Sequence, residues 1–304
     1  MFSKLKRAAQ HWDKVSSNPQ GSRIRWWQSQ SILEHINRRF TGEPGLRSIP
    51  AGDIAALQKR FPGRTFANGI SVGCGDGSKE MTLVHRGLVS RFDCFEISSV
   101  RVKMGQEKAE KLGIADRVTF RMEDAFAWTE ANQNYQYDFV YWNNSLHHML
   151  DVDHAVHWSQ EVLMEGGVFY MNDFVGPTKM QWSDTMLDIA SRVRQALPDK
   201  YLVDYRNSSK LLSKTVARPD PDKLTAMDPT ECADSERIID SIKKYFVDPE
   251  IILTGGTVYH TALNDVLNNL DESDDQHILE LLLIIDDLCT MLGETHYGVA
   301  IATK

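Results

Sequence analysis

The chain has 304 residues, of which 42% are hydrophobic and 25% charged, with 19 Gly and 10 Pro. This is the composition of a folded globular protein, and it excludes a collagen, a solenoid and a long disordered region. The longest strongly apolar stretch, 278–285, contains Glu280 and is far shorter than the roughly 18 to 20 residues of a membrane helix. The length fits one large α/β domain that carries an appendage.

We expect a cytoplasmic protein with reduced thiols. Lys4, Lys6 and Arg7 are followed by no apolar block, so no secretory signal is predicted. The four cysteines stand far apart and form no C-x-x-C pair, which argues against a zinc knuckle and against a disulfide framework. They are Cys74, Cys94, Cys232 and Cys289.

The net charge of −8 conceals an asymmetry along the chain. Residues 1–64 hold 12 Lys and Arg against 4 Asp and Glu, a balance of +8, which leaves −16 for the remainder. A basic segment of this kind could attract an anionic substrate or a nucleic acid. A solvated face on helical segments is the alternative interpretation.

The hydrophobic pattern predicts helices first and then an alternation of strands and helices. In the first part, one helix is predicted over 25–40, and Asp53 is a possible cap for a second helix over 54–61. From residue 66, short apolar runs alternate with helical segments, which predicts parallel βαβ units with helices on both faces of the sheet. The predicted strands are 66–72, 91–97, 118–122, 138–142 and 168–172, and the predicted helices between them are 78–88, 100–112 and 152–163.

After Gly176 and Pro177 the alternation stops. An amphipathic helix over 180–197 and a polar stretch that follows it predict an inserted cap, after which strand and helix order resumes. The later elements are a helix over 235–246, a strand over 250–253, a long helix over 260–292 and a last strand over 297–303. We therefore predict a helical lead-in over 1–65, a cap over 176–228, and one catalytic domain made of 66–175 and 229–304.

The most informative segment is 70–77, Ile-Ser-Val-Gly-Cys-Gly-Asp-Gly, in which a predicted strand leads into three alternate glycines and then a helix. Glycine lets the backbone pass close to a ligand, because a Cβ would collide with it. A nicotinamide-binding fingerprint counted from Gly73 would need glycine where Ser78 stands, and the Lys-Ser/Thr ending of a triphosphate-binding loop is missing. The loop therefore favours neither of these ligands.

Two acidic residues follow at the ends of the next predicted strands, where open α/β sheets bind ligands. Glu96 could accept hydrogen bonds from two ribose hydroxyls, each worth about 1.5–3 kcal/mol with a charged acceptor. Asp124, in Met-Glu-Asp-Ala-Phe at 122–126, could accept the exocyclic amine of an adenine. A lone glycine loop is a weak signal, but the three features in this order predict an adenosyl ligand.

These motifs resemble those of the class I S-adenosylmethionine-dependent methyltransferases. The resemblance covers about 66–175, and it includes Asp-Phe-Val-Tyr-Trp-Asn-Asn-Ser-Leu-His-His at 138–148 and the glycine pair 166–167. It implies an α/β fold with a Rossmann-like, seven-stranded, mainly parallel sheet whose last strand is antiparallel. It also implies S-adenosyl-L-methionine as the cofactor and S-adenosyl-L-homocysteine as the product. The rest of the chain is similar to a bacterial subgroup that acts on small molecules.

By that resemblance the three glycines approach the methionine portion, Glu96 binds ribose, and Asp124 and Ala125 contact adenine. Asn143 would lie beside the sulfonium. The predicted cofactor-binding residues are Gly73, Cys74, Gly75, Gly77, Glu96, Ile97, Asp124, Ala125 and Asn143.

Methyl transfer is an in-line displacement, so alignment of donor and acceptor does most of the catalytic work. A hydroxyl acceptor also needs a base, and a histidine suits that task. We predict His148 as the base and His147 as the second choice, because two adjacent side chains are not expected to face the same atom. Asp173 could orient a histidine or hold the acceptor. Helix capping, or filling a polar gap, is the alternative role for these residues.

The sequence of segment 143–146 also limits which acceptor atoms are expected. It has Asn-Asn-Ser-Leu in place of the Asn/Asp-Pro-Pro-Tyr element that grips planar nitrogens, so amide and nucleobase nitrogens are less favoured acceptors. No clustered set of carboxylates matches a catechol-type magnesium site, and we therefore predict no metal.

The N-terminal helices and the cap are expected to fold over the strand ends and to form the acceptor pocket. Its predicted lining residues are Arg25, Trp26, Trp27, Trp182 and Tyr205. Arg23 and Arg25 could recognise an acceptor carboxylate or phosphate, and a surface role is the alternative for both. Aromatic residues at helical spacing are more often core residues, which is the alternative. The apolar helix around 278–285 is predicted to be buried under the sheet rather than to form a partner groove.

The leading hypothesis is a methyltransferase that moves the methyl group of S-adenosylmethionine to a hydroxyl of a small molecule, such as a sugar or a secondary metabolite. N-methylation of a small amine is the near rival. An RNA methyltransferase, suggested by the basic lead-in, and a non-catalytic adenosyl-binding module are the remaining hypotheses. We expect no membrane partner, and the oligomeric state stays open.

Overall fold

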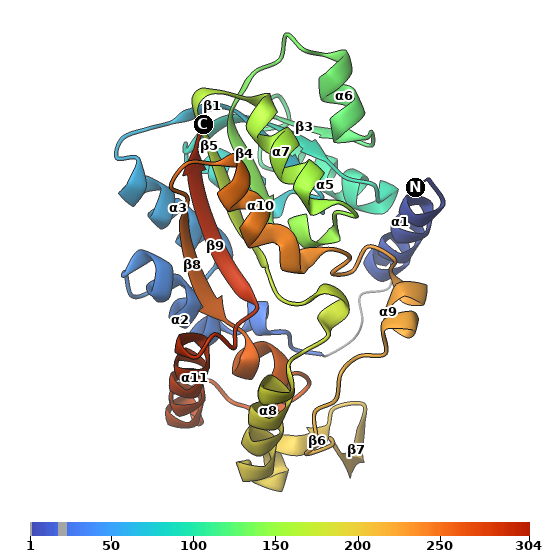
Figure 1. Ribbon diagram of the computed structural model, residues 1–304, viewed down its shortest axis with the longest axis vertical. Coiled ribbons are helices and arrows are strands. Elements are labelled where there is room, and N and C mark those ends of the chain that lie inside the picture. The colour runs from blue at the N-terminus through green and yellow to red at the C-terminus, as the bar shows by residue number, and fades with distance from the viewer. Residues whose placement is uncertain (1, 18–22) are drawn as a thin grey trace.

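The computed structural model describes residues 2–17 and 23–304, and its main feature is a seven-stranded sheet with the order β3-β2-β1-β4-β5-β9-β8 (Figure 1). Strand β9 is antiparallel to both of its neighbours, and the other paired strands are parallel. This confirms the predicted fold class. The strands are β1 (Phe66–Val72), β2 (Val89–Phe95), β3 (Val118–Arg121), β4 (Tyr137–Asn143), β5 (Leu163–Phe174), β8 (Glu250–Gly255) and β9 (Tyr297–Thr303).

Both faces of the sheet are covered because the central strands are apolar on both sides. In β4, Phe139 and Tyr141 belong to one core cluster, while Val140 and Trp142 belong to the other. Successive side chains of a strand point to opposite faces, so such a strand needs helices on each side. The first face packs against α2 (Gln30–Thr41), α3 (Ile49–Arg60), α4 (Ser78–His85), α5 (Ser99–Lys111) and α11 (Gln276–Met291), and the second against α6 (Ala125–Ala131), α7 (Val152–Val162) and α10 (Ile238–Tyr245).

The N-terminal lead-in is divided between two sides of the molecule. Helix α1 (Phe2–Ser17) packs on α5, whereas α2 and α3 lie on the opposite side in Figure 1. The single helix predicted over 25–40 was wrong: a short 3-10 helix, Trp26–Gln28, ends at Ser29. The Ser29 hydroxyl accepts a hydrogen bond from the Ile32 amide and so begins α2, as serine does at many helix N-termini.

Asp53 does not cap a helix, contrary to the prediction. Ser48 caps α3, and Asp53 lies inside that helix with its carboxylate fully buried. The carboxylate accepts four hydrogen bonds, from the Tyr141 hydroxyl (2.5 Å) and the Asn143 amide (2.7 Å) on β4, and from the Tyr170 hydroxyl (2.5 Å) and the Asn172 amide (2.9 Å) on β5. Burial raises the pKa of Asp53, although the hydrogen bonds oppose that shift.

The segment predicted as a cap contains α8 (Asp184–Ala196), the hairpin of β6 (Val203–Asp204) with β7 (Asn207–Leu211), and α9 (Pro221–Met227). Lys179 links the part of the chain that enters this segment to the part that leaves it. The Lys179 amide donates to the Cys232 carbonyl (2.8 Å), and its ammonium group donates to the carbonyls of Pro229 and Glu231, both at 3.1 Å. Lys179, Met180 and Cys232 all have left-handed φ angles, of 55°, 53° and 46°.

The single long helix predicted over 260–292 is also wrong. The structure has a π-helix (Thr257–Ala262), a short 3-10 helix (Leu267–Asn269) and then α11. Helix α11 packs against the sheet with one side only, and its outer side exposes an apolar row, contrary to the prediction that the apolar run is buried there. The row consists of Leu281, Ile284, Ile285, Leu288, Met291 and Leu292. None of the helices in the described ranges has both the length and the apolar character needed to cross a membrane.

We expect Asp53→Ala to lower the free energy of unfolding by at least about 3 kcal/mol, since each buried donor left unpaired costs about 1–3 kcal/mol. Urea denaturation followed by circular dichroism measures this loss. Asp188→Ala is the matched control, because Asp188 is an exposed helical aspartate; its effect should stay within about 0.5 kcal/mol. Equal losses in the two variants would show that the buried network contributes nothing.

Candidate functional site

The glycine loop follows β1 at the point where the strand order of the sheet reverses, between β1 and β4. Gly73, Gly75 and Gly77 have φ angles of 69°, 63° and 65°, which side-chain-bearing residues rarely adopt. A Cβ on Gly77 would lie 2.5 Å from the Phe120 ring, and one on Gly73 would lie 3.0 Å from the Cβ of Ser145. The loop therefore lies directly against the segment that follows β4, where the predicted catalytic histidines stand.

Glu96 has the geometry expected of a ribose-binding residue. Its side chain is buried, and its two carboxylate oxygens accept hydrogen bonds from the amides of Gly75 and Ser98, both at 2.8 Å. A carboxylate has about four acceptor sites, so two remain for a pair of vicinal hydroxyls. Burial raises the pKa of Glu96, against the effect of these hydrogen bonds.

Asp124 begins α6, and one of its oxygens accepts from the amides of Phe126 (2.9 Å) and Ala127 (3.2 Å). The second oxygen accepts no hydrogen bond from the described part of the chain, so it is available to an exocyclic amine. Asp124 and His148 both line a groove of about 960 Å³ beside α6 and α7. Ala125 is buried next to Asp124.

The other predicted cofactor residues differ in how accessible they are. Cys74 is buried, and Ile97 is 39% exposed. Asn143 is buried, and its side chain is already engaged: its amide nitrogen donates to Asp53, and its oxygen accepts from the Lys79 ammonium (2.8 Å). Its placement beside a sulfonium stays a prediction.

His147 is held by Asp173. Its Nδ1 lies 2.5 Å from one carboxylate oxygen of Asp173, and the other oxygen accepts from the amides of Ser145 (2.8 Å) and Leu146 (2.7 Å). Burial raises the pKa of Asp173, but the imidazole and these amides outweigh burial and hold it below its usual range. Burial lowers the pKa of His147, but the Asp173 carboxylate outweighs it, and the result is a pKa above the ordinary 6.5.

His148 is held by a different pair of residues, Thr230 and Asp228. Its Nδ1 lies 3.1 Å from the Thr230 hydroxyl oxygen, and that hydroxyl donates its proton to Asp228 at 2.6 Å. Burial and the neighbouring His147 lower the pKa of His148 to about 4.

Glu231 joins the two histidines. The Nε2 atom of His147 lies 3.8 Å from one Glu231 oxygen, and the Nε2 atom of His148 lies 3.9 Å from the other. The loop turns both rings toward one carboxylate, each toward a different oxygen, with the ring centroids 4.2 Å apart, so the two histidines share a partner group without facing the same atom. Burial raises the pKa of Glu231, but both histidines outweigh it and hold it below its usual range.

Sequence reasoning missed Asp228, Thr230 and Glu231. They stand where the inserted segment returns to the sheet, at least eighty positions from the histidines. The sequence Asp-Pro-Thr-Glu at 228–231 was visible, but nothing local in it indicates that it lies beside the end of β4.

Helix α1 covers one side of this region. The Asp13 carboxylate accepts from the Ser98 hydroxyl (2.6 Å), next to the predicted ribose site. The Trp12 ring lies beneath the guanidinium of Arg101, 4.1 Å away, and meets the ring of His148 edge-on at 5.5 Å. Of the N-terminal helices, α1 is therefore the one that lies over the strand ends.

Of the predicted pocket residues, two are core residues. Trp26 and Trp182 are buried, and Trp182 stacks on His296 with a centroid distance of 4.6 Å, whereas Trp27 is 47% exposed. Arg25 is partly buried and makes no ion pair with a described residue. Burial and the charge of Arg23 lower the pKa of Arg25, while the Asp265 and Glu231 carboxylates oppose that shift. The Arg25 guanidinium lies over the Trp27 ring, 5.6 Å from its centroid.

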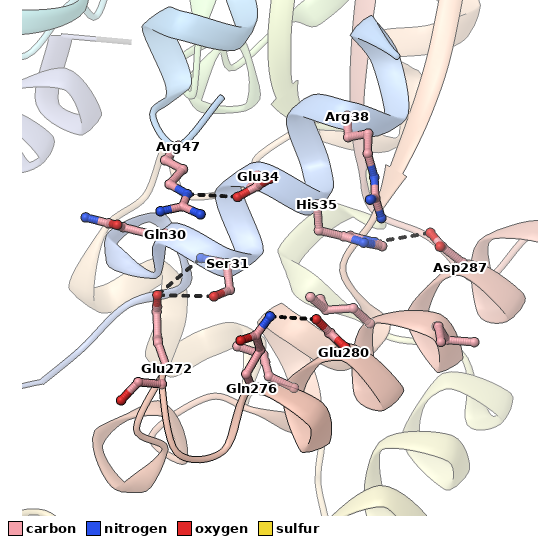
Figure 2. Close-up of a pocket in the computed structure, with 14 residues that line it drawn as sticks. Gln30, Ser31, Glu34, His35, Arg38, Arg47, Glu272, Gln276, Glu280 and Asp287 are labelled. Atoms are coloured by element: carbon pink, nitrogen blue, oxygen red, sulfur yellow. Dashed lines mark hydrogen bonds and ion pairs between the residues drawn. The ribbon is translucent and has the colours of Figure 1, made fainter. Parts of the chain in front are cut away.

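Figure 2 shows a second hollow, of about 720 Å³, between α2 and α11. Side chains meet across it: His35 of α2 faces Asp287 of α11 at 3.2 Å, and the Ser31 hydroxyl of α2 donates at 3.2 Å to Glu272, in the turn that precedes α11. None of the predicted site residues lines this hollow, so it is separate from the glycine loop and the histidines.

Comparison with known proteins agrees with this geometry. Residues 67–219, half of the chain, match the family described as a methyltransferase domain. The chain therefore belongs to this family, within the class I S-adenosylmethionine-dependent methyltransferases. It is 26% identical over 151 residues to the 27-O-demethylrifamycin SV methyltransferase of Amycolatopsis mediterranei (strain S699). That match covers 49% of this chain and 49% of the relative, so the chain spans about half of the relative's length.

Two solved structures show the same fold at low identity. A geranyl diphosphate C-methyltransferase from Streptomyces coelicolor A3(2) superposes with a TM-score of 0.53 at 14% identity, covering 99% of this chain and 97% of the other. Phosphoethanolamine N-methyltransferase 2 of Haemonchus contortus gives a TM-score of 0.51 at 14% identity, covering 96% of this chain and 60% of the other. At these identities the comparison establishes the fold and not the acceptor.

We expect the double variant Glu96→Ala, Asp124→Ala to bind S-adenosylmethionine at least a hundredfold more weakly than the unchanged chain, because each carboxylate supplies charged hydrogen bonds worth about 1.5–3 kcal/mol. Isothermal titration calorimetry with S-adenosylmethionine and S-adenosylhomocysteine measures this. Glu107→Ala together with Asp116→Ala removes two exposed acids and controls for net charge. Undiminished binding by the first pair would remove these residues from the cofactor site.

Proposed function

We propose that the chain is an S-adenosylmethionine-dependent methyltransferase that methylates a hydroxyl group of a small molecule. The fit of the cofactor is supported by the left-handed glycine loop, by the free acceptor sites on buried Glu96 and by the free oxygen of Asp124. When bound, the cofactor supplies a methyl group on an activated sulfonium leaving group. The chain's own task is to align the acceptor and to accommodate its proton.

The observation that carries the proposal for a hydroxyl acceptor is the pairing of His147 with Asp173, next to the glycine loop. Ionised Asp173 can only accept at His147 Nδ1, so in the neutral ring the lone pair is on Nε2, which faces away from Asp173. A nitrogen in that state can take a hydroxyl proton. We propose His147 rather than His148 as the base, because a carboxylate on its Nδ1 stabilises the charged ring more than the Thr230 hydroxyl does for His148, and this reverses the order proposed from the sequence.

The acceptor that we propose is anionic. Arg25 is a partly buried cation without an ion-pair partner among the described residues, and its guanidinium lies over the half-exposed ring of Trp27. A planar guanidinium binds carboxylate or phosphate through two parallel hydrogen bonds. We keep 176–228 as the proposed cap, which would shape the acceptor side of the site.

Replacing both histidines by asparagine should lower kcat/KM for a hydroxyl acceptor by 10²-fold or more. Transfer to a neutral amine at high pH should fall less than about tenfold, because such an amine needs no base during attack. Conversion to S-adenosylhomocysteine, with the site of methylation assigned by mass spectrometry, is the measurement. His157→Asn, on the exposed side of α7, is the matched control. Hydroxyl methylation that continues at the full rate in the double variant at neutral pH would exclude the proposed base.

Arg25→Met should raise KM at least tenfold for a phosphorylated sugar and leave KM for the corresponding neutral sugar within about twofold, because only the charged acceptor loses an ion pair. Arg192→Met, an exposed arginine of the cap, should change neither value. Equal KM changes for the two acceptors would rule out recognition of the anion by Arg25.

A further inference from the structure

Three donor groups converge where β4 ends and the inserted segment rejoins the sheet. They are the imidazoles of His147 and His148 and the carboxylate of Glu231, and one donor atom from each lies within 4.8 Å of the other two. The distances from the two Nε2 atoms to the Glu231 oxygens are 3.8 and 3.9 Å, which is slightly wider than a hydrogen bond. All three side chains are largely shielded from solvent.

Each histidine is oriented so that its Nε2 lone pair points into this space. His147 must donate from Nδ1 to Asp173, because an ionised carboxylate has no proton to give. His148 must donate from Nδ1 to Thr230, because the Thr230 hydroxyl has already given its only proton to Asp228. Both rings therefore present unprotonated Nε2 atoms to Glu231 whenever they are neutral.

This arrangement has the features of a built metal site. Histidine ligands of metals usually donate their second ring N–H to a carboxylate, hydroxyl or carbonyl, which fixes the ring and the tautomer. Here both rings are fixed in this way, by two independent partners. Two imidazoles and one carboxylate form the donor set of open, three-ligand catalytic sites, which leave other positions free for a substrate.

We propose that His147, His148 and Glu231 bind one divalent first-row transition-metal cation, which in turn binds the acceptor's hydroxyl oxygen. Imidazole ligands favour Fe²⁺, Co²⁺, Ni²⁺ or Zn²⁺ over Mg²⁺ or Ca²⁺, which prefer sets made of oxygen alone. The absence of metal predicted from the sequence considered only clusters of carboxylates, and this donor set is of another kind.

The inference rests on the proposed function for the position of the acceptor. It changes the step in which the acceptor hydroxyl loses its proton. While the cation is bound, the histidines are ligands, and the hydroxyl proton passes to water because coordination lowers its pKa. The oxygen then forms a bond to the methyl carbon as the bond from sulfur to that carbon breaks. The products are the methyl ether and the neutral thioether, and one proton is released to solvent.

The test uses tag-free full-length chain that has been treated with a chelator and titrated with Co²⁺ alone, followed by calorimetry and by visible absorption. We expect one Co²⁺ per chain, with ligand-field bands of nitrogen and oxygen coordination, and far weaker binding of Mg²⁺. Glu231→Gln and His148→Gln should weaken Co²⁺ binding at least a hundredfold. Thr230→Val, which only frees the second nitrogen of His148, should weaken it about tenfold or more.

Glu165→Gln and His277→Gln remove an exposed carboxylate and an exposed imidazole elsewhere and should leave the titration unchanged. Unchanged affinity for S-adenosylmethionine shows that each variant is folded. Absence of Co²⁺ binding, or Co²⁺ binding that survives in Glu231→Gln and His148→Gln, would overturn the metal site. If the chelated enzyme still methylates a hydroxyl at the full rate, the proposed function holds and the cation has no catalytic part. Cation binding without any methylation of hydroxyls would defeat the proposed function alone.

Discussion

The buried carboxylate of Asp53 is the constraint on which the geometry of the site depends. It reaches from α3 into the sheet and accepts hydrogen bonds from two positions on β4 and two on β5. Its last partner on β4, Asn143, immediately precedes the loop that carries the histidines, and its last partner on β5, Asn172, immediately precedes Asp173. One carboxylate thus fixes the ends of two neighbouring strands from which the site is built. Any shift of these strands relative to α3 would leave buried donors without acceptors, and each such donor costs free energy of folding.

A second level of order lies in the direction of the hydrogen bonds. Asp173 and Thr230 each accept from the Nδ1 of a different histidine, and neither can reverse its bond. The two rings are therefore alike in tautomer although their surroundings differ: burial and His147 lower the pKa of His148, whereas Asp173 raises that of His147 against burial. Glu231 faces both rings, and its negative charge offsets the positive charge of a protonated histidine. The site is polar and preorganised by partners that do not themselves face the acceptor.

Much of the fold could be predicted because its signals are local. The buried strands are short apolar runs, and the glycine loop, Glu96 and Asp124 follow their strands directly. The errors arose where a local rule competed with a tertiary contact. Asp53 looked like a helix cap, but Ser48, followed by Pro50, was the better cap, and the burial of Asp53 depends on strands more than eighty residues away.

The breaks in the two overlong helices, at Ser29 and in the Asp-rich turn after residue 270, were local signals that the hydrophobic pattern outweighed. The pairing of 228–231 with the histidines is different in kind. No periodicity or motif connects the two segments, and their contact exists only because the inserted segment returns to the sheet. No local signal therefore indicated the residues that surround the histidines, whereas the glycine loop, Glu96 and Asp124 could be found because each follows a predicted strand.

The hydrogen bonds of Lys179 at the base of the inserted segment affect which parts of that segment can vary in length and sequence. Lys179 joins the outgoing stem to the returning one through three hydrogen bonds, so the ends of the segment are held together whatever lies between them. Once the ends are closed, doubling the length of a flexible loop adds only about 0.6 kcal/mol of entropy. Helix α8 within the segment packs into the main core through Met186, Ala190 and Val193, so the exposed hairpin of β6 and β7 is the part whose length can change. Asp228, Thr230 and Glu231 lie on the other side of the Lys179 junction, and changes in the hairpin leave them in place beside the histidines.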